Sequence, residues 1–189
     1  VRFFLIPHIK ALSEKYDLTL VVNVDDTQFL ERLGLKIRIF NLPIERNISL
    51  VKDFKALFLL SHFLIKEKIN VIHTVAPKAG FIGMLAGWLV GVPCRLHIFQ
   101  GEVWILKKGI WKFILKNADR LVSTLATHLL VVSKSERNFL ISENIINENK
   151  SRTLANGSIS GVDLDRFKPD RITRYKIRSE LKITESDVV

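Results

Sequence analysis

The stretch NVIHTVAPKAGFIGMLAGWLVGVPCRLHIFQ, residues 70–100, decides the fold. It opens with residues 70–75, a short apolar run rich in β-branched residues, which predicts a buried strand. Residues 78–90 are apolar with several Gly, which predicts a buried helix with Pro77 near its start. Residues 92–100 predict the next strand. A strand, a helix and a second strand in this order indicate a parallel βαβ unit.

The same alternation continues on both sides of this unit. Before it, the pattern predicts a helix over 3–15, a strand over 17–23, a short helix over 26–34, a strand over 35–43 and a helix over 49–68. After it, the pattern predicts helices over 105–118 and 118–128, a strand over 129–133, a helix over 134–142 with Ser133 as its N-cap, and a strand over 151–155. The predicted fold class is α/β, a Rossmann-like parallel sheet with helices on both faces.

The composition changes near residue 156, which predicts a domain junction. NGSISGVDLDRFKPDR, residues 156–171, is loop-rich, and a new helical pattern follows it. We therefore expect one domain over residues 1–156, and a junction with the start of a second domain over 157–189. The first residues are already helical in pattern and the last resemble the start of a strand, so we expect a chain cut at both ends.

The amino-acid composition limits the classes of binding partner but does not select one of them. The 29 Lys and Arg against 19 Asp and Glu leave a net charge of +10, which suits phosphates, nucleic acid or an anionic membrane. A single cysteine, Cys94, excludes an intramolecular disulfide and fits a reducing compartment. The uncharged run over 79–94 is too short to span a bilayer. The five His lack ligand spacing, so no metal site is expected, and no motif supports nucleic-acid binding.

In open parallel sheets, ligands bind beyond the carboxyl ends of the strands. This rule selects three loops, over 74–80, 100–108 and 156–163. In the first, Lys78 and Gly80 open a helix, whose free N–H groups and macrodipole favour an anion. A plain turn, with Gly80 allowing close packing of helix on sheet, remains the alternative.

The second loop holds the candidate catalytic residues. Gln100 and Glu102 follow the strand end and flank Gly101, where the chain turns. Polar side chains in this place can bind substrate or transfer protons, so we expect Gln100 and Glu102 to be functional. His97, within the strand, is expected to be a core imidazole.

The segment WILKKGIWKFILKNADR, residues 104–120, is basic and aromatic. Lys108, Lys112 and Lys116 are four residues apart and share one helical face. With Trp104 and Trp111, this face can lie on an anionic lipid surface. A helix packed on the core with a solvated basic face remains the alternative.

The third loop carries a resemblance. ANGSISGVDLDRFKP, residues 155–169, resembles the junction segment of the family 4 glycosyltransferases of the GT-B fold, with Ser160 where an Asn is frequent. PKAGFIGMLAGWLVGVPCRLHIFQGEVW, residues 77–104, and VVSKSERNFLI, residues 131–141, resemble other segments of the same family in the same order.

The resemblance implies two Rossmann-like domains that face each other across a cleft. This chain would be the N-terminal, acceptor-side half without its first strand, and the donor-binding half would follow. Family members are retaining enzymes that use nucleotide sugars, without a cofactor and usually without a metal. Several of them extend lipid-linked acceptors for bacterial surface polysaccharide, such as O-antigen lipopolysaccharide or capsule, at the cytoplasmic face of the inner membrane. Peripheral attachment there agrees with the basic aromatic segment.

The residues that match the family motifs are few. Lys78, Gly80, Gln100 and Gly101 match the acceptor-binding side, and Gly157, Ser158 and Gly161 match the junction at the edge of the donor cleft. Gln100 stands where many members have His, so imidazole chemistry is excluded at that position. The expected activity is transfer of a sugar to a lipid-linked or polysaccharide acceptor. A non-catalytic basic module that binds membrane or a partner, and a two-domain nucleotide-sugar epimerase, remain the alternatives.

Overall fold

The computed structural model describes residues 5–24, 28, 31–45, 48–159, 161–165, 167–184 and 186–188. The elements of the first half, in chain order, are α1 (Ile6–Ser13), β1 (Thr19–Val22), the 3-10 helix η2 (Glu31–Leu33), β2 (Arg38–Asn41), α2 (Leu50–Lys66), β3 (Val71–Val75) and α3 (Pro77–Leu89). Those of the second half are β4 (Cys94–Phe99), η3 (Val103–Leu106), α4 (Gly109–Leu125), β5 (His128–Val131), α5 (Lys134–Ser142), η4 (Glu148–Lys150), β6 (Ser151–Arg152) and α6 (Arg171–Glu180).

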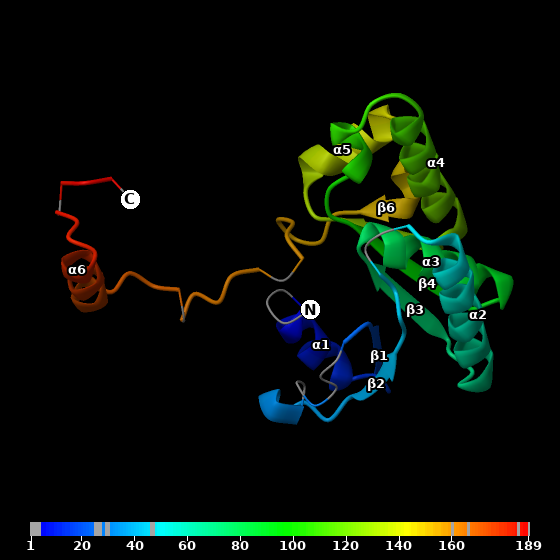
Figure 1. Cartoon of the computed structure of the whole chain (residues 1–189), viewed down its shortest axis with the longest axis horizontal. Coiled ribbons are helices and arrows are strands. Elements are labelled where there is room, and N and C mark those ends of the chain that lie inside the picture. Colours follow the sequence, from blue (N-terminus) through cyan, green and yellow to red (C-terminus); the bar gives the residue numbers. More distant parts are fainter. Residues whose placement is uncertain are drawn as a thin grey trace.

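Every strand pairing among the described residues is parallel, as the sequence predicts. β3, β4, β5 and β6 form a 4-stranded sheet in chain order, and β1 and β2 form a separate 2-stranded sheet. Figure 1 shows the two sheets apart from each other. The sequence pattern implies a single sheet, whereas the structure has two. Within the described residues, no strand connects the pair β1 and β2 to β3.

Helices cover both faces of the larger sheet. Side chains of a strand alternate between its faces. Thr74 of β3 contacts α3, since a Cβ placed on Gly83 would meet the Thr74 methyl group. The next side chain back, His73, faces the other way and meets His8 of α1, with ring centroids 5.3 Å apart. The predicted α/β architecture with helices on both faces is confirmed.

α2, α3 and α4 form one layer on the sheet. Figure 1 shows them side by side, and α3 contacts both of its neighbours. α3 is apolar all round because it is covered by two helices and a sheet, so it lacks an exposed polar stripe. The core is built from this layer and the strands beneath it, with Leu42, Met84, Trp104, Val122, Leu129 and Leu140 among its most buried side chains.

After β6 the chain extends away from the sheets and the helices packed on them. Figure 1 shows a long connection to α6, which lies well away from the sheets. The Asp170 side chain caps α6 by accepting from the N–H groups of Ile172 and Thr173. Ile172 and Tyr175 of this helix are exposed. Among the described residues, no helix combines the length and the apolar character that crossing a bilayer requires.

Two predicted elements differ from the structure. The expected pair of helices over 105–118 and 118–128 is a single helix, α4, preceded by the short η3, because the run that starts at Gly109 continues its amphipathic period without a break. The expected helix over 26–34 lies partly outside the described residues, and its end is a 3-10 turn rather than an α-helix.

Candidate functional site

The third predicted loop packs against the carboxyl end of β5. Ser158 donates its backbone N–H to the carbonyl of Val132 at 2.6 Å. Gly157 has a φ of 100°, and a Cβ there would clash with the same carbonyl, so only glycine fits this turn. Gly161 then donates its N–H to the Ser158 hydroxyl at 3.3 Å. Ser160, the remaining residue of the junction motif, lies outside the described residues.

Lys78 and Gly80 of the first loop both make packing contacts within the protein. Lys78, at the start of α3, forms an ion pair with Asp53 of α2 at 2.6 Å, so its charge is already used between helices. Gly80 is buried, and a Cβ on it would clash with the His97 imidazole. The structure thus favours the packing alternative for Gly80, and neither residue lines the pocket described below.

His97 is a core residue, as predicted. Only 3% of it is exposed, and its Nδ1 lies 2.8 Å from the Thr74 hydroxyl. Burial lowers the pKa of His97 to about 4, with a smaller effect of His73. Burial and the neighbouring His8 lower the pKa of His73 to about 4 as well. Both imidazoles are therefore neutral at physiological pH.

An open pocket of about 500 Å³ lies where β4 and β5 end. Volumes in this range are typical of small-molecule sites. Gln100, Gly101 and Glu102 form one side of it, confirming that they lie together at the strand end. The other side comes from the turn after β5 and from α5, with Val132, Ser133, Ser135, Glu136 and Phe139.

Glu136 is the residue that sequence reasoning missed. Ser133 caps α5 as predicted, since its hydroxyl accepts from the Glu136 N–H at 3.0 Å. A Glu at this spacing commonly reaches back to the capping residue. Here the Glu136 side chain extends to the loop after β4 instead, and its Oε1 accepts a hydrogen bond from the N–H of Gly101 at 2.5 Å. The Ser-x-x-Glu spacing over 133–136 was the available signal, but it cannot reveal the partner.

Glu102 is buried and has a raised pKa. Only 8% of the residue is exposed, in contrast to the exposed Gln100 before it. Burial, then the neighbouring carboxyl of Glu136 and, with a smaller effect, Asp119 together raise the pKa of Glu102 to about 7. Burial also raises the pKa of Asp119, to about 6, against the opposing hydrogen bond from Trp104.

Trp104 does not face a membrane, and its assignment to the membrane-facing set is wrong. Only 2% of it is exposed. Its Nε1–H donates to Asp119 at 2.9 Å, and its ring stacks on Phe139 with centroids 5.8 Å apart. Lys116 lies over the same ring, 5.2 Å from its centroid, and pairs with Glu143, so its ammonium group is also engaged within the protein.

The other members of that set are at the surface. Lys108, Trp111 and Lys112 are exposed near the start of α4. Exposed apolar side chains surround them, namely Leu106, Ile110 and Phe113. The observed face thus combines cations and apolar groups, but it is formed by η3 and the first turns of α4 rather than by Trp104 and Lys116.

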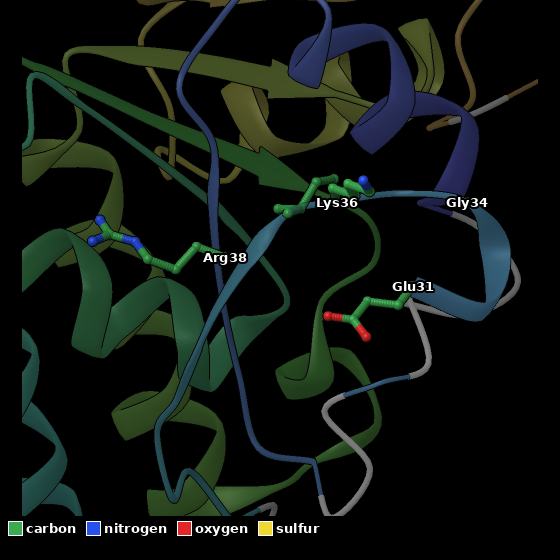
Figure 2. Close-up of a pocket in the computed structure, with 5 residues that line it drawn as sticks. Glu31, Gly34, Lys36 and Arg38 are labelled. Carbon is green, nitrogen blue, oxygen red and sulfur yellow. The ribbon is translucent and has the colours of Figure 1, made fainter.

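Figure 2 shows a second pocket of about 550 Å³, lined by Glu31, Gly34, Lys36, Ile37 and Arg38. Arg38 extends away from Glu31 and Lys36 in this view, and its guanidinium pairs with Glu67 at 2.7 Å. This pocket lies at the start of β2, whereas ligands of parallel sheets bind where strands end. We therefore do not assign it a function.

Residues 9–157 match the model of the family described as "Glycosyl transferase 4-like domain". The chain is 31% identical over 159 residues to the UDP-Gal:alpha-D-GlcNAc-diphosphoundecaprenol alpha-1,3-galactosyltransferase of Escherichia coli, covering 83% of this chain and 40% of the relative. It is 30% identical over 129 residues to the capsular polysaccharide biosynthesis glycosyltransferase CapM of Staphylococcus aureus, covering 68% of this chain and 34% of the relative. The chain thus spans well under half of these curated relatives.

Solved structures show the same fold. The UDP-GlcNAc 2-epimerase of Methanocaldococcus jannaschii superposes with a TM-score of 0.63 at 23% identity, over 80% of this chain and 42% of that one. MurG of Acinetobacter baumannii superposes with a TM-score of 0.53 at 16% identity, over 85% of this chain and 41% of that one. At these identities the likeness concerns the fold alone, one half of a GT-B-type enzyme. With a family model matching most of its length, the chain belongs to the glycosyl transferase 4-like family.

Proposed function

We propose that this chain is the acceptor-side part of a glycosyltransferase that moves a sugar from a nucleotide-sugar donor to a lipid-linked or polysaccharide acceptor in bacterial surface polysaccharide synthesis. The observation that carries the proposal is the family match over 9–157 together with two relatives whose names specify sugar transfer. One of those relatives uses a UDP-sugar and a diphosphoundecaprenol-linked acceptor, which makes these the first substrates to test.

The pocket at the ends of β4 and β5 supports an acceptor site. Its walls offer an amide at Gln100, a hydroxyl at Ser133 and the carboxyl groups of Glu102 and Glu136, all groups that hydrogen-bond sugar hydroxyls. Glu102 is our candidate for proton exchange with the acceptor hydroxyl, because a carboxyl with a pKa of about 7 is suited to that task. Gln100 carries an amide, which can only orient the substrate.

The turn over 156–161 supports the proposal that this part of the chain borders the donor-binding cleft. Gly157 and Ser158 rest on the end of β5, beside the pocket, and the chain then departs towards α6. We infer that residues 157–189 lead into the donor-binding half, and that Gly157, Ser158 and Gly161 border the cleft between the two halves. Transfer with retention of configuration and without a metal belongs to the same proposal.

The basic apolar face around Lys108, Trp111 and Lys112 supports peripheral attachment to an anionic membrane at its cytoplasmic face. Cations next to exposed aromatic and aliphatic side chains are the composition of interfacial helices. Such attachment would bring the pocket to an acceptor held in the bilayer. Lys78 would act only at the margin of that site, since Asp53 pairs with it.

The test is a lipid-extraction assay of the longer protein that contains this chain. Radiolabelled UDP-sugars would be incubated with vesicles that contain a GlcNAc-diphosphoundecaprenol acceptor. We expect label to move into the organic phase with one of the sugars. Label that stays in nucleotide sugars but appears in an epimer would replace the proposal with an epimerase. Vesicle binding with no conversion of any sugar would replace it with a non-catalytic module.

A further inference from the structure

Glu102 and Glu136 both line the pocket, and they come from different elements. Glu102 precedes η3 and Glu136 lies in the first turn of α5. The Glu136 carboxyl lies close enough to Glu102 to raise the pKa of Glu102 through its charge and its hydrogen-bonding capacity. Each has one buried oxygen without a donor, Oε1 of Glu102 and Oε2 of Glu136. Two ionised carboxylates in contact would repel, whereas one proton between them turns the contact into a hydrogen bond.

Within the part of the chain that the structure describes, no cation is recorded beside the pair. The only donor to Glu136 that the described residues show is the N–H of Gly101, and its second oxygen is buried without a donor. Asp119 of α4 adds a third carboxyl nearby, and its hydrogen bond comes from the uncharged indole of Trp104. Among the described residues that line the pocket, none is Lys, Arg or His. The pocket is therefore unsuited to phosphate, although the chain as a whole has a charge of +10.

We propose that Glu102 and Glu136 hold one proton between them and that this pair binds the hydroxyl groups of an uncharged sugar ring. A carboxyl pair with one proton both donates and accepts, as a hydroxyl group does, so the two are complementary. The Phe139 ring supplies an apolar wall for the C–H face of the sugar. The diphosphate of a lipid-linked acceptor lies outside this pocket. The choice of a sugar as the ligand rests on the proposed function, whereas the shared proton does not.

The shared proton is tested by carbon-13 NMR of the glutamate side-chain carboxyl groups across a pH titration. We expect the midpoint of Glu102 in the Glu136→Gln variant to fall by about one unit or more, because the neighbouring charge is removed. An unchanged midpoint overturns the pair. If that variant does not fold, the unaltered protein still gives an answer: infrared spectra must show a protonated carboxylic acid at neutral pH, and its absence overturns the pair.

The ligand is tested by backbone amide NMR of this chain with two probes, N-acetylglucosamine and inorganic pyrophosphate. We expect the sugar to shift the amide signals of Gly101 and Ser133 saturably, and Glu102→Gln to weaken its binding at least about fivefold. The matched control, Glu14→Gln, alters an exposed carboxyl just after the end of α1 and must leave the binding unchanged. Pyrophosphate that shifts the same amides as strongly, or sugar that shifts neither, overturns the inference.

The experiments distinguish failure of the carboxyl-pair inference from failure of the proposed transferase function. A longer protein that transfers no sugar, while this pocket still binds the monosaccharide through Glu102, refutes the transferase and leaves the carboxyl pair intact. A longer protein that transfers sugar normally with Glu102→Gln refutes the carboxyl pair as a hydroxyl-binding group and leaves the transferase intact.

Discussion

The backbone N–H of Gly101 donates a hydrogen bond to the Glu136 carboxylate at 2.5 Å, and this bond joins the loop after β4 to the first turn of α5. Gly101 has a φ of 104°, which L-residues with side chains rarely adopt. The bond therefore holds a turn that depends on glycine against a helix that Ser133 caps. Together these contacts shape the pocket in which Glu102 is buried.

The cap of α5 predicts a difference between two serines in equivalent positions. Ser133→Ala removes the bond to the Glu136 N–H and is expected to lower the free energy of unfolding by about 1 kcal/mol. Ser49 occupies the same position at α2 but its side chain makes no capping hydrogen bond, so Ser49→Ala is the matched control and is expected to cost clearly less. Urea denaturation measures both. Equal losses would show that the cap does not stabilise α5.

The contact between Gly80 and His97 predicts coupled substitutions. Gly80→Ala places a methyl group against the imidazole and is expected to destabilise the protein by about 1–3 kcal/mol. The same change should cost less in a His97→Ala background, since the space is then free. A double-mutant cycle of unfolding free energies measures this coupling. Strict additivity of the two substitutions would exclude the packing role of Gly80.

The raised pKa of Glu102 predicts a pH-dependent stability difference. The folded pKa is about 7 and the ordinary value is 4.5, so between these values the folded protein binds more protons than the unfolded one. The contribution of Glu102 to stability is thus present at low pH and declines as the pH rises to 7. The Glu102→Gln side chain does not titrate. The free energy of unfolding of this variant, relative to that of the wild type, should therefore rise by at least about 1 kcal/mol between about pH 5 and pH 8.

This comparison isolates Glu102 from the histidines. His73 and His97 have lowered pKa values, so they act in the opposite direction and weaken the fold as the pH falls towards 4. Both histidines are present in wild type and variant, and their effects cancel in the difference. A constant difference between Glu102→Gln and wild type across this range would mean that Glu102 titrates normally.

The basic apolar face predicts membrane binding that depends on particular lysines. Changing Lys108 and Lys112 to Glu should weaken sedimentation with anionic vesicles by about tenfold or more. Changing Lys10 and Lys36, which are exposed on α1 and before β2, alters the net charge equally and should have a much smaller effect. Equal effects of the two pairs would indicate attraction by net charge alone. Lys116 is left out because it pairs with Glu143.

Local pattern predicted most of the fold. The βαβ unit over 70–100, the parallel pairing, the core position of His97 and the Ser133 cap depend on spacing along the chain, and all are confirmed. The separation of β1 and β2 from the other strands could not be predicted, because hydrophobic period does not say which strands pair.

The site was harder to predict, because its key contacts join residues distant in the chain. Trp104 was placed at the membrane from its basic aromatic neighbours, but Asp119 and Phe139 cover it. No sequence pattern singled out Glu136, and its bond to Gly101 spans 35 positions. In both cases the residue type is compatible with two environments, and only tertiary structure selects one.

The central claim is that this chain forms the acceptor-side half of a sugar-transferring enzyme, and one comparison of transfer rates tests it most directly. The longer protein and this chain alone would be assayed side by side with labelled UDP-sugars and the diphosphoundecaprenol-linked acceptor. We expect labelled lipid from the longer protein and none from residues 1–189 alone. Transfer by the isolated chain, or no labelled lipid from the longer protein with any donor, would contradict it.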